Sequence, residues 1–185
     1  MIVIIDYGMG NLHSVYKALK RLNTPALVSS SPKDIERADK LILPGVGHFK
    51  RGMENLKALG LLPVLNKKVL VEKTPILGIC LGIQLFTKHS EEGDVPGLSW
   101  IEAETIKFNA SDLKIPHMGW NSIKIEKKNP ILSNLDPEKQ FYFVHSYHVM
   151  PKDKGIISST TKYGINFVSA INKENIFGVQ FPPRF

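Results

Sequence analysis

A glycine-flanked cysteine in the segment 74–86 constrains the fold more than any other feature of the sequence. The segment reads Thr-Pro-Ile-Leu-Gly-Ile-Cys-Leu-Gly-Ile-Gln-Leu-Phe, and Cys80 is the only cysteine of the chain. Apolar residues run continuously before Cys80 and recur at helical spacing after it, so the pattern predicts a strand that passes directly into a helix. Gly78 and Gly82 carry no Cβ and permit the sharp turn of a nucleophile elbow. We expect the cysteine side chain to stand at the strand tip, facing a cleft.

Two properties of this turn favour a reactive cysteine. The helix that follows Cys80 should direct free N–H groups and its positive dipole end at the sulfur, which favours the thiolate. The backbone amide of Leu81 is placed to bind a developing oxyanion. The alternative interpretation is a small buried cysteine, which is the commoner case for an isolated cysteine. The flanking glycines favour the nucleophile.

The first 90 residues alternate between strand-like and helix-like patterns. Such alternation is typical of right-handed βαβ units, which build a parallel sheet with its active site at the carboxyl ends of the strands. The expected strands are 1–5, 26–28, 40–43 and 76–79, and the expected helical segments are 12–22, 31–35 and 53–71.

Shorter strand-like runs follow Pro96, and the segment 109–112 is the most loop-like. Neither a linker-like composition nor a repeat separates the two halves, so we expect one mixed α/β domain spanning residues 1–185. His145 and His148 should alternate along one strand and face opposite sides. The expected strands are 100–106, 122–125, 141–147, 155–160, 167–171 and 176–181.

Two glycine-rich segments follow the first and third expected strands. The segment 6–11 has no third glycine at His13, so we expect a helix entry there and not a dinucleotide site. The segment 44–49 has closely spaced glycines that could aim N–H groups into a cleft, or could form a plain turn. A neighbouring nucleophile elbow favours the first interpretation.

Composition narrows the class of protein. The chain has 185 residues, of which 43% are hydrophobic and 22% are charged, as in ordinary soluble domains. A single cysteine excludes an internal disulfide, and the N-terminus lacks the pattern of a signal peptide. Glycine, proline or charge interrupts every long apolar run before it could span a membrane. We therefore expect a cytoplasmic protein without membrane contact.

The net charge of +7 raises the possibility of a nucleic-acid partner. The lysines are scattered, however, and the densest group is Lys124, Lys127 and Lys128. Recognition motifs and alternating aromatic and basic residues are missing, so we expect no nucleic-acid binding. The charge fits a solvated basic face or a surface that docks an acidic protein.

Several motifs, taken together in their order and spacing, resemble one family. They are Asp-Tyr-Gly-Met-Gly-Asn at 6–11, Pro-Gly-Val-Gly-His-Phe at 44–49, Gly-Ile-Cys-Leu-Gly-Ile-Gln at 78–84, Pro-His-Met-Gly-Trp-Asn at 116–121 and Phe-Val-His-Ser-Tyr at 143–147. This set resembles the class I glutamine amidotransferases, and among them the glutaminase subunits of imidazole glycerol phosphate synthase.

The resemblance implies a flavodoxin-like α/β fold with a mixed, mostly parallel sheet flanked by helices. It also implies a Cys-His-Glu triad that releases ammonia from glutamine without a cofactor or a metal. Cys80 would attack the side-chain amide, and His145 would shape the pocket without a catalytic role. The implied oxyanion-binding residues are Val46, Gly47 and Leu81. The implied glutamine-binding residues are Gln84, Glu92, Ser146 and Tyr147.

The family also implies a partner. Ammonia would pass to a barrel-shaped cyclase subunit that forms imidazole glycerol phosphate in histidine biosynthesis. Trp120 and Asn121 match that interface. Read without the family, Trp120 could fill a gap in the core and Gln84 could be a solvated helix residue.

The chain departs from the family at the triad. The family reads His-Pro-Glu and continues into a final helix, whereas this sequence reads Pro182-Pro-Arg184-Phe and the usual helix is expected to be missing. Proline cannot accept a proton and arginine stays protonated. A single-nucleotide insertion after the Phe181 codon would convert common codons for His-Pro-Glu into Pro-Pro-Arg, so a frame slip is one hypothesis. Two alternatives to a glutaminase of histidine biosynthesis stay open: a pseudo-glutaminase that binds the cyclase without chemistry, and a paralogue that supplies ammonia for surface-sugar amidation.

Overall fold

The computed structural model describes residues 1–109, 113–136 and 138–182. A long mixed sheet crosses the molecule in the order β2-β1-β3-β4-β14-β13-β11-β7-β5-β6. Its first four strands in the sequence are β1 (Ile2–Ile5), β2 (Ala26–Ser29), β3 (Lys40–Gly45) and β4 (Ile76–Cys80). The helical segments between and after them are α1 (Leu12–Arg21), α2 (Pro32–Glu36), α3 (Phe49–Ala58), α4 (Leu62–Asn66), the π-helical turn Lys67–Val71 and α5 (Leu81–Leu85).

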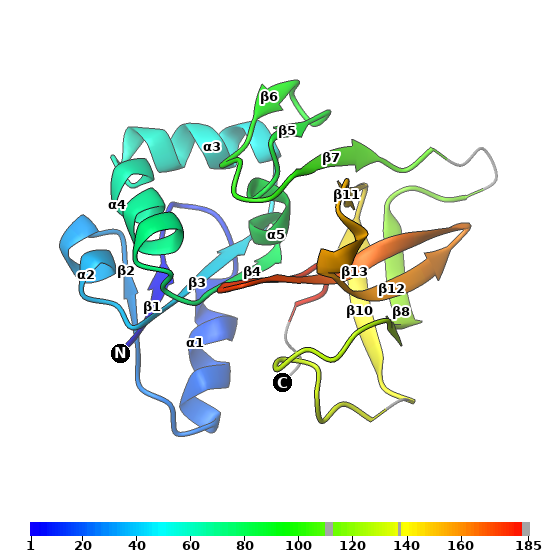
Figure 1. Cartoon of the computed structure of the whole chain (residues 1–185), viewed down its shortest axis with the longest axis horizontal. Helices are drawn as coiled ribbons and strands as arrows, with labels where there is room; N and C mark the ends of the chain where they lie inside the picture. The colour runs from blue at the N-terminus through cyan, green and yellow to red at the C-terminus, as the bar shows by residue number, and fades with distance from the viewer. Residues whose placement is uncertain (110–112, 137, 183–185) are drawn as a thin grey trace.

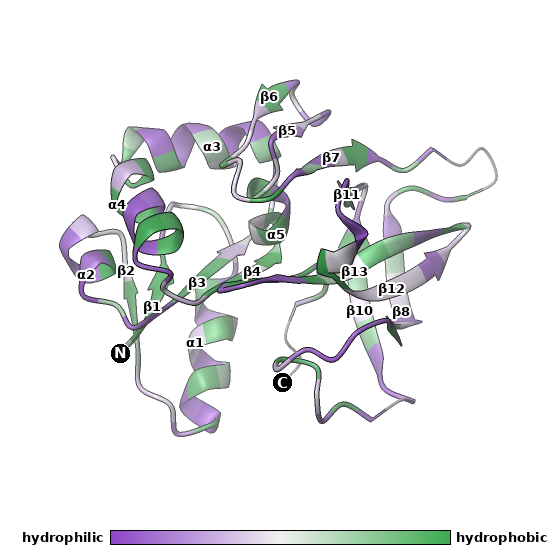
Figure 2. Cartoon of the chain, viewed as in Figure 1, coloured by the Kyte–Doolittle hydropathy of each residue, from purple (hydrophilic) through white to green (hydrophobic). Residues whose placement is uncertain are grey.

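The sheet is parallel from β2 to β14 (Ile176–Val179) and helices cover both of its faces (Figure 1). Alternate residues of β1 face opposite ways. Val3 and Ile5 pack in the cluster that includes residues of α3, α4 and α5, whereas Ile4 packs with Val15 of α1. These strands are coloured as hydrophobic along most of their length in Figure 2, while the helices alternate. Burial on two faces explains their continuous apolar runs.

The remaining strands are mainly antiparallel. β13 (Ile165–Lys173) lies between β14 and β11 (Tyr147–Pro151) and also pairs with β12 (Ile157–Tyr163), while β8 (His117–Ser122) and β10 (Gln140–His145) form a separate two-stranded sheet. The other segments are β5 (His89–Ser90), β6 (Val95–Pro96), β7 (Ala103–Lys107), β9 (Lys124–Ile125) and the 3-10 turn Lys154–Ile156. The expected combination of flanking helices with a mixed sheet that has a parallel core is confirmed.

Some boundaries differ from the sequence-based predictions. The helical segment expected from residue 53 begins at Phe49. It is divided near Gly60 and Pro63, the residues that interrupt the helical spacing in the sequence. The strand expected at 122–125 begins at His117, because this segment pairs along its whole length with β10. The loop expected at 109–112 lies outside the described residues beyond Asn109.

The prediction for the two strand histidines is wrong. Ser146 interrupts the strand between β10 and β11, so His145 and His148 do not lie on one continuous pleat. Both rings instead pack against Phe108, with ring centroids 5.2 Å away for His145 and 4.7 Å away for His148. One aromatic cluster therefore holds both side chains.

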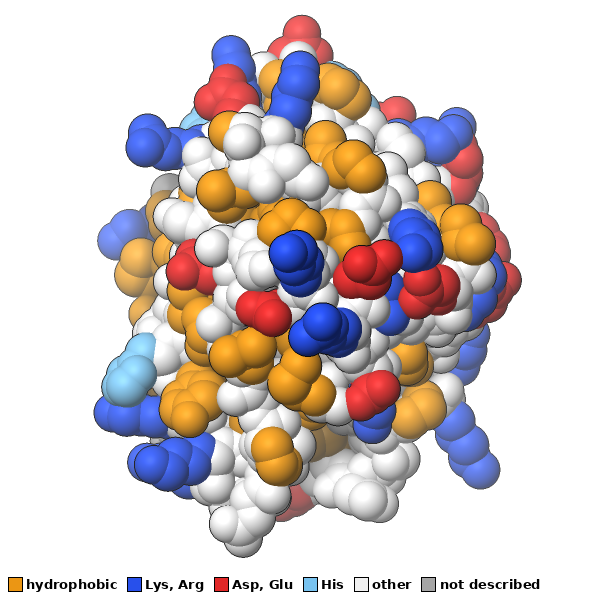
Figure 3. Space-filling view, turned by 90° about the vertical axis from the view of Figure 1, so that its left-hand side faces the viewer, with side chains coloured by type: hydrophobic (Ala, Val, Ile, Leu, Met, Phe, Trp, Pro, Cys, Tyr) orange, Lys and Arg blue, Asp and Glu red, His pale blue; other side chains and the backbone are white. Residues whose placement is uncertain are grey.

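Charged side chains of both signs are interspersed on the face shown in Figure 3. Ion pairs account for part of this mixture, for example those that Lys67 forms with Glu36 and Glu72. None of the helices in the described parts of the chain has the length and apolar character needed to cross a bilayer.

Candidate active site

Cys80 lies at the carboxyl end of β4, at the point where the chain turns into α5. Its φ of 54° and ψ of −110° are strained for a residue with a side chain. A Cβ on Gly82 would collide with the carbonyl oxygen of Leu43, and one on Gly78 would lie 2.6 Å from the Phe86 ring. The glycines therefore permit the close packing of β3, β4 and α5 that holds Cys80 in this conformation.

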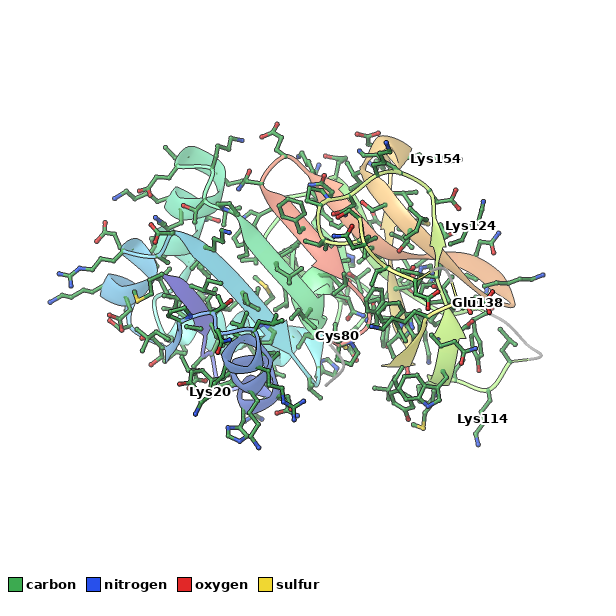
Figure 4. All side chains as sticks on the ribbon, turned by 90° about the horizontal axis from the view of Figure 1, so that it is seen from below. Lys20, Cys80, Lys114, Lys124, Glu138 and Lys154 are labelled. Atoms are coloured by element: carbon green, nitrogen blue, oxygen red, sulfur yellow. The ribbon has the colours of Figure 1, made fainter. Side chains whose placement is uncertain are left out.

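A cavity of about 350 Å³ opens beside Cys80. All of the residues predicted for catalysis, oxyanion binding and glutamine binding line it, together with Pro116, Val144 and His145. They come from the turn after β3, from the end of β4, from α5, from the loop between β5 and β6, and from the junction of β10 and β11. Figure 4 shows Cys80 between α1 and the strands of the C-terminal half. The predicted set is Val46, Gly47, Cys80, Leu81, Gln84, Glu92, Ser146 and Tyr147.

Two polar side chains of this cavity are held by the protein itself. The Glu92 Oε2 accepts a hydrogen bond of 2.8 Å from the backbone N–H of Phe49, the first residue of α3. The Gln84 side chain is buried, and its Nε2 donates at 3.0 Å both to the Tyr147 carbonyl and to Gln180 Oε1. Gln84 is thus a buried link between β11 and the segment that follows β14, and not a solvated helix residue.

The resting form of Cys80 is the thiol. Burial raises the pKa of the thiol to about 11, while the Leu81 amide and the Gln180 side chain oppose this rise and the Glu92 carboxylate adds to it. The helix N-terminus therefore favours the thiolate through the Leu81 amide, as expected, but burial outweighs this contribution. Since α5 has only five residues, few peptide dipoles are aligned behind the sulfur, and burial dominates.

Sequence reasoning missed two neighbours of Cys80. The Gln180 Nε2 donates to Cys80 Sγ at 3.7 Å, from the segment that follows β14. The hydroxyl of Tyr7 is buried without a hydrogen-bond partner among the described residues, and burial together with Cys80 raises the pKa of this phenol. Their positions near Cys80 depend on how β1 and β14 are arranged around β4, which local sequence patterns do not encode.

A general base for Cys80 is not among these neighbours. His145 lines the cavity, but its Nδ1 lies 2.7 Å from the Tyr147 carbonyl and its Nε2 lies 3.1 Å from His117 Nδ1. Burial lowers the pKa of His145 to about 3, so the ring is neutral. In the described parts of the chain, no three His, Cys, Asp or Glu side chains gather in an arrangement that could hold a metal ion.

Pro182 lies on the other side of Cys80. It lines a second cavity of about 240 Å³ with apolar neighbours from β3, β4 and α1. The polar side chains among its described lining residues are Asn11, Ser14 and Cys80. Arg184, which the family resemblance aligns with a triad glutamate, lies outside the described residues.

Trp120 and Asn121 lie away from both cavities, on β8. Trp120 is 45% exposed and packs edge-on against Tyr142 with ring centroids 5.2 Å apart, so it does not fill a gap in the core. Asn121 is partly buried, and its Nδ2 donates to the Lys162 carbonyl at 2.9 Å and lies 3.3 Å from His117 Nε2.

The family model for class I glutamine amidotransferases matches residues 3–184. The chain belongs to this family. Among its relatives, the imidazole glycerol phosphate synthase subunit HisH 2 of Methanococcus maripaludis is 54% identical over 185 residues, which cover all of this chain and 92% of the relative. The subunit HisH 2 of Pseudomonas aeruginosa is 47% identical over 185 residues, with the same coverage.

Solved structures agree on the fold of this amidotransferase. A crystal structure titled glutamine amidotransferase superposes with a TM-score of 0.72 at 18% identity, covering 98% of this chain and 90% of that one. A glutamine amidotransferase from Thermotoga maritima gives a TM-score of 0.68 at 14% identity, covering 98% of this chain and 74% of that one. The family resemblance and the fold class expected from the sequence are both confirmed.

Proposed function

We propose that this amidotransferase is the glutaminase subunit of an imidazole glycerol phosphate synthase. It would convert glutamine to glutamate and ammonia, and the ammonia would reach a cyclase subunit for imidazole glycerol phosphate formation in histidine biosynthesis. The observation that carries the proposal is the convergence of Cys80 and its predicted binding residues on one cavity. The names of the relatives support the same assignment.

The cavity suggests how the reaction would proceed. The sulfur of Cys80 would attack the carboxamide carbon of glutamine, and backbone N–H groups of Gly47 and Leu81 would stabilise the oxyanion. Cleavage of the C–N bond, with the thiol proton passing to the nitrogen, would release ammonia and leave a thioester. Water would then add to the thioester carbon, which releases glutamate and returns a proton to the sulfur. The Glu92 carboxylate would attract the α-ammonium group of glutamine, and Ser146 and Tyr147 would orient the substrate.

The outer surface of the β8–β10 sheet is the proposed contact with a barrel-shaped cyclase subunit. Met118 is 61% exposed and Val144 is 45% exposed, and the two lie opposite each other in the register. Trp120 and Asn121 lie on the same sheet. Exposed apolar side chains gathered in one place are typical of protein interfaces. The proposal includes a cytoplasmic heterodimer built on one amidotransferase domain.

A second candidate, a pseudo-glutaminase, is favoured by the apolar surroundings of Pro182 next to Cys80. Such a protein would bind the cyclase and glutamine without turnover. The third candidate, a paralogue that supplies ammonia for surface-sugar amidation, would share the same cavity and differ in its acceptor.

A glutamine-hydrolysis assay in the presence of a cyclase subunit and its ligand tests the proposal. Because Pro182 supplies no base, we expect turnover about 10³- to 10⁶-fold below that of an intact glutaminase. Complex formation with the cyclase and binding of glutamine are still expected. Turnover like that of an intact relative would show that another group acts as the base, and failure to bind either the cyclase or glutamine would refute the assignment.

A further inference from the structure

The proposed reaction does not use two buried histidines, His117 and His145, of which His145 lines the cavity beside Cys80. His117 is on β8 and His145 is at the end of β10, and their rings face one another across the antiparallel pair. Asn121 lies at one end of this pair and the Tyr147 carbonyl at the other. All of these groups are at least partly buried, so each hydrogen bond that they make is shielded from water.

The chemistry of the partners fixes where each proton lies. The Tyr147 carbonyl can only accept, so His145 must carry its proton on Nδ1. His145 is neutral because burial lowers its pKa, and its Nε2 therefore accepts from His117 Nδ1 at 3.1 Å. Burial also lowers the pKa of His117. The remaining His117 Nε2 then accepts from the Asn121 amide.

The chain of contacts continues beyond the Tyr147 carbonyl. This oxygen also accepts from Gln84 Nε2 at 3.0 Å, and the same nitrogen donates to Gln180 Oε1. With its oxygen occupied in this way, the Gln180 amide turns its nitrogen toward Cys80 Sγ. An amide in the opposite orientation would place an acceptor against the sulfur and two donors against each other.

We propose that Asn121, His117 and His145 are positioning residues, which act through two neutral Nδ1–H imidazoles and through Tyr147, Gln84 and Gln180 to aim a hydrogen-bond donor at Cys80. The inference rests on the proposed function only in taking Cys80 as the reacting group. The hydrogen bonds of these residues connect the β8–β10 sheet to the sulfur of Cys80. A partner that contacts Asn121 would therefore act on the first donor of the chain.

The ring-nitrogen NMR spectrum of the unmodified protein tests the proton assignment directly. We expect both His117 and His145 to show the Nδ1–H tautomer, while His13, which is exposed on α1, provides the reference signal of a free ring. A Nε2–H tautomer at either buried histidine would overturn the proposal. This measurement requires no variant and no glutamine turnover.

The variant Asn121→Asp tests the coupling to Cys80, because a carboxylate of the same shape cannot donate to His117. We expect His117 to take its proton on Nε2, which breaks its bond to His145, and the iodoacetamide reaction of Cys80 at a fixed pH of about 8.5 to slow about two- to tenfold. Ser122→Ala, an exposed position on the same strand, is the control. Unchanged tautomers together with a Cys80 rate equal to that of the control would refute the relay, whatever the protein does with glutamine.

Discussion

The two cavities that both border Cys80 differ in the polarity of the residues that line them. The larger one, of about 350 Å³, has Glu92, Ser146, Tyr147 and backbone amides along its wall. The smaller one, of about 240 Å³, is bordered mainly by apolar groups and includes Pro182. The groups that would bind glutamine come from several packed elements, whereas the triad that the family resemblance implies places its proton-transferring groups at positions 182 and 184 alone. Substitutions at these two positions would remove the chemistry while the binding site remains.

The largest expected effect comes from giving the smaller cavity its missing base. The double variant Pro182→His and Arg184→Glu should raise cyclase-dependent glutamine hydrolysis by about 10²- to 10⁴-fold, the usual contribution of a general base. Release of ammonia and glutamate is the measurement. Pro182→Ala, which removes the proline without adding a base, should leave the rate at background. Equal rates for the two variants would show that the smaller cavity is not where the proton is transferred.

An intermediate effect is expected from changing the larger cavity. Glu92→Gln keeps the shape of the side chain and removes its charge, so glutamine affinity should fall about tenfold or more through loss of a charge-assisted contact. Calorimetric titration of the unmodified and variant proteins checks this. Glu104→Gln, an exposed position on β7, is the matched control. A Glu92 variant that binds glutamine as tightly as the control would remove Glu92 from the proposed binding site.

The smallest expected effect is a pH dependence of stability that arises from Cys80 itself. Since burial raises the pKa of the thiol from 9.0 to about 11, the folded state holds its proton more tightly than the unfolded state. The resulting contribution to the free energy of unfolding is complete below pH 9 and is lost as the pH rises toward 11. Denaturant titrations at pH 8 and pH 11 should show a smaller pH-dependent loss for Cys80→Ser. An identical loss in both proteins would contradict a raised pKa.

The sequence pattern was sufficient to predict that two parts of the cavity wall meet, whereas Glu92, Ser146 and Tyr147 were assigned to it only through the family resemblance. Parallel strands bring their carboxyl ends to one edge, so the turn at Gly47 and the elbow at Cys80 had to meet once β3 and β4 were recognised as neighbours. The contact between Gln180 and Cys80 could not be predicted in this way. It spans 100 residues and depends on the register of β14 against β4.

The state of the cysteine was harder to predict than its position. A glycine pattern reports backbone geometry, but the pKa of a thiol depends on how completely neighbouring elements exclude water. The helix α5 is short because the chain turns at Phe86, and the ring of Phe86 packs against Trp100, a residue distant in the sequence. For the same reason, the break at Ser146 that brings His145 and His148 to one aromatic cluster was not visible as a change in residue type.

The position of β14 has a consequence for the order of assembly. β14 is the last described strand in the sequence, but it lies in the middle of the sheet between β4 and β13. As the chain leaves the ribosome, the two halves can form local structure while β4 and β13 still present unpaired edges to each other. Synthesis of residues 176–179 would join them. The strand that carries Cys80 and the antiparallel half of the molecule thus join in one sheet only after residues 176–179 have been synthesised.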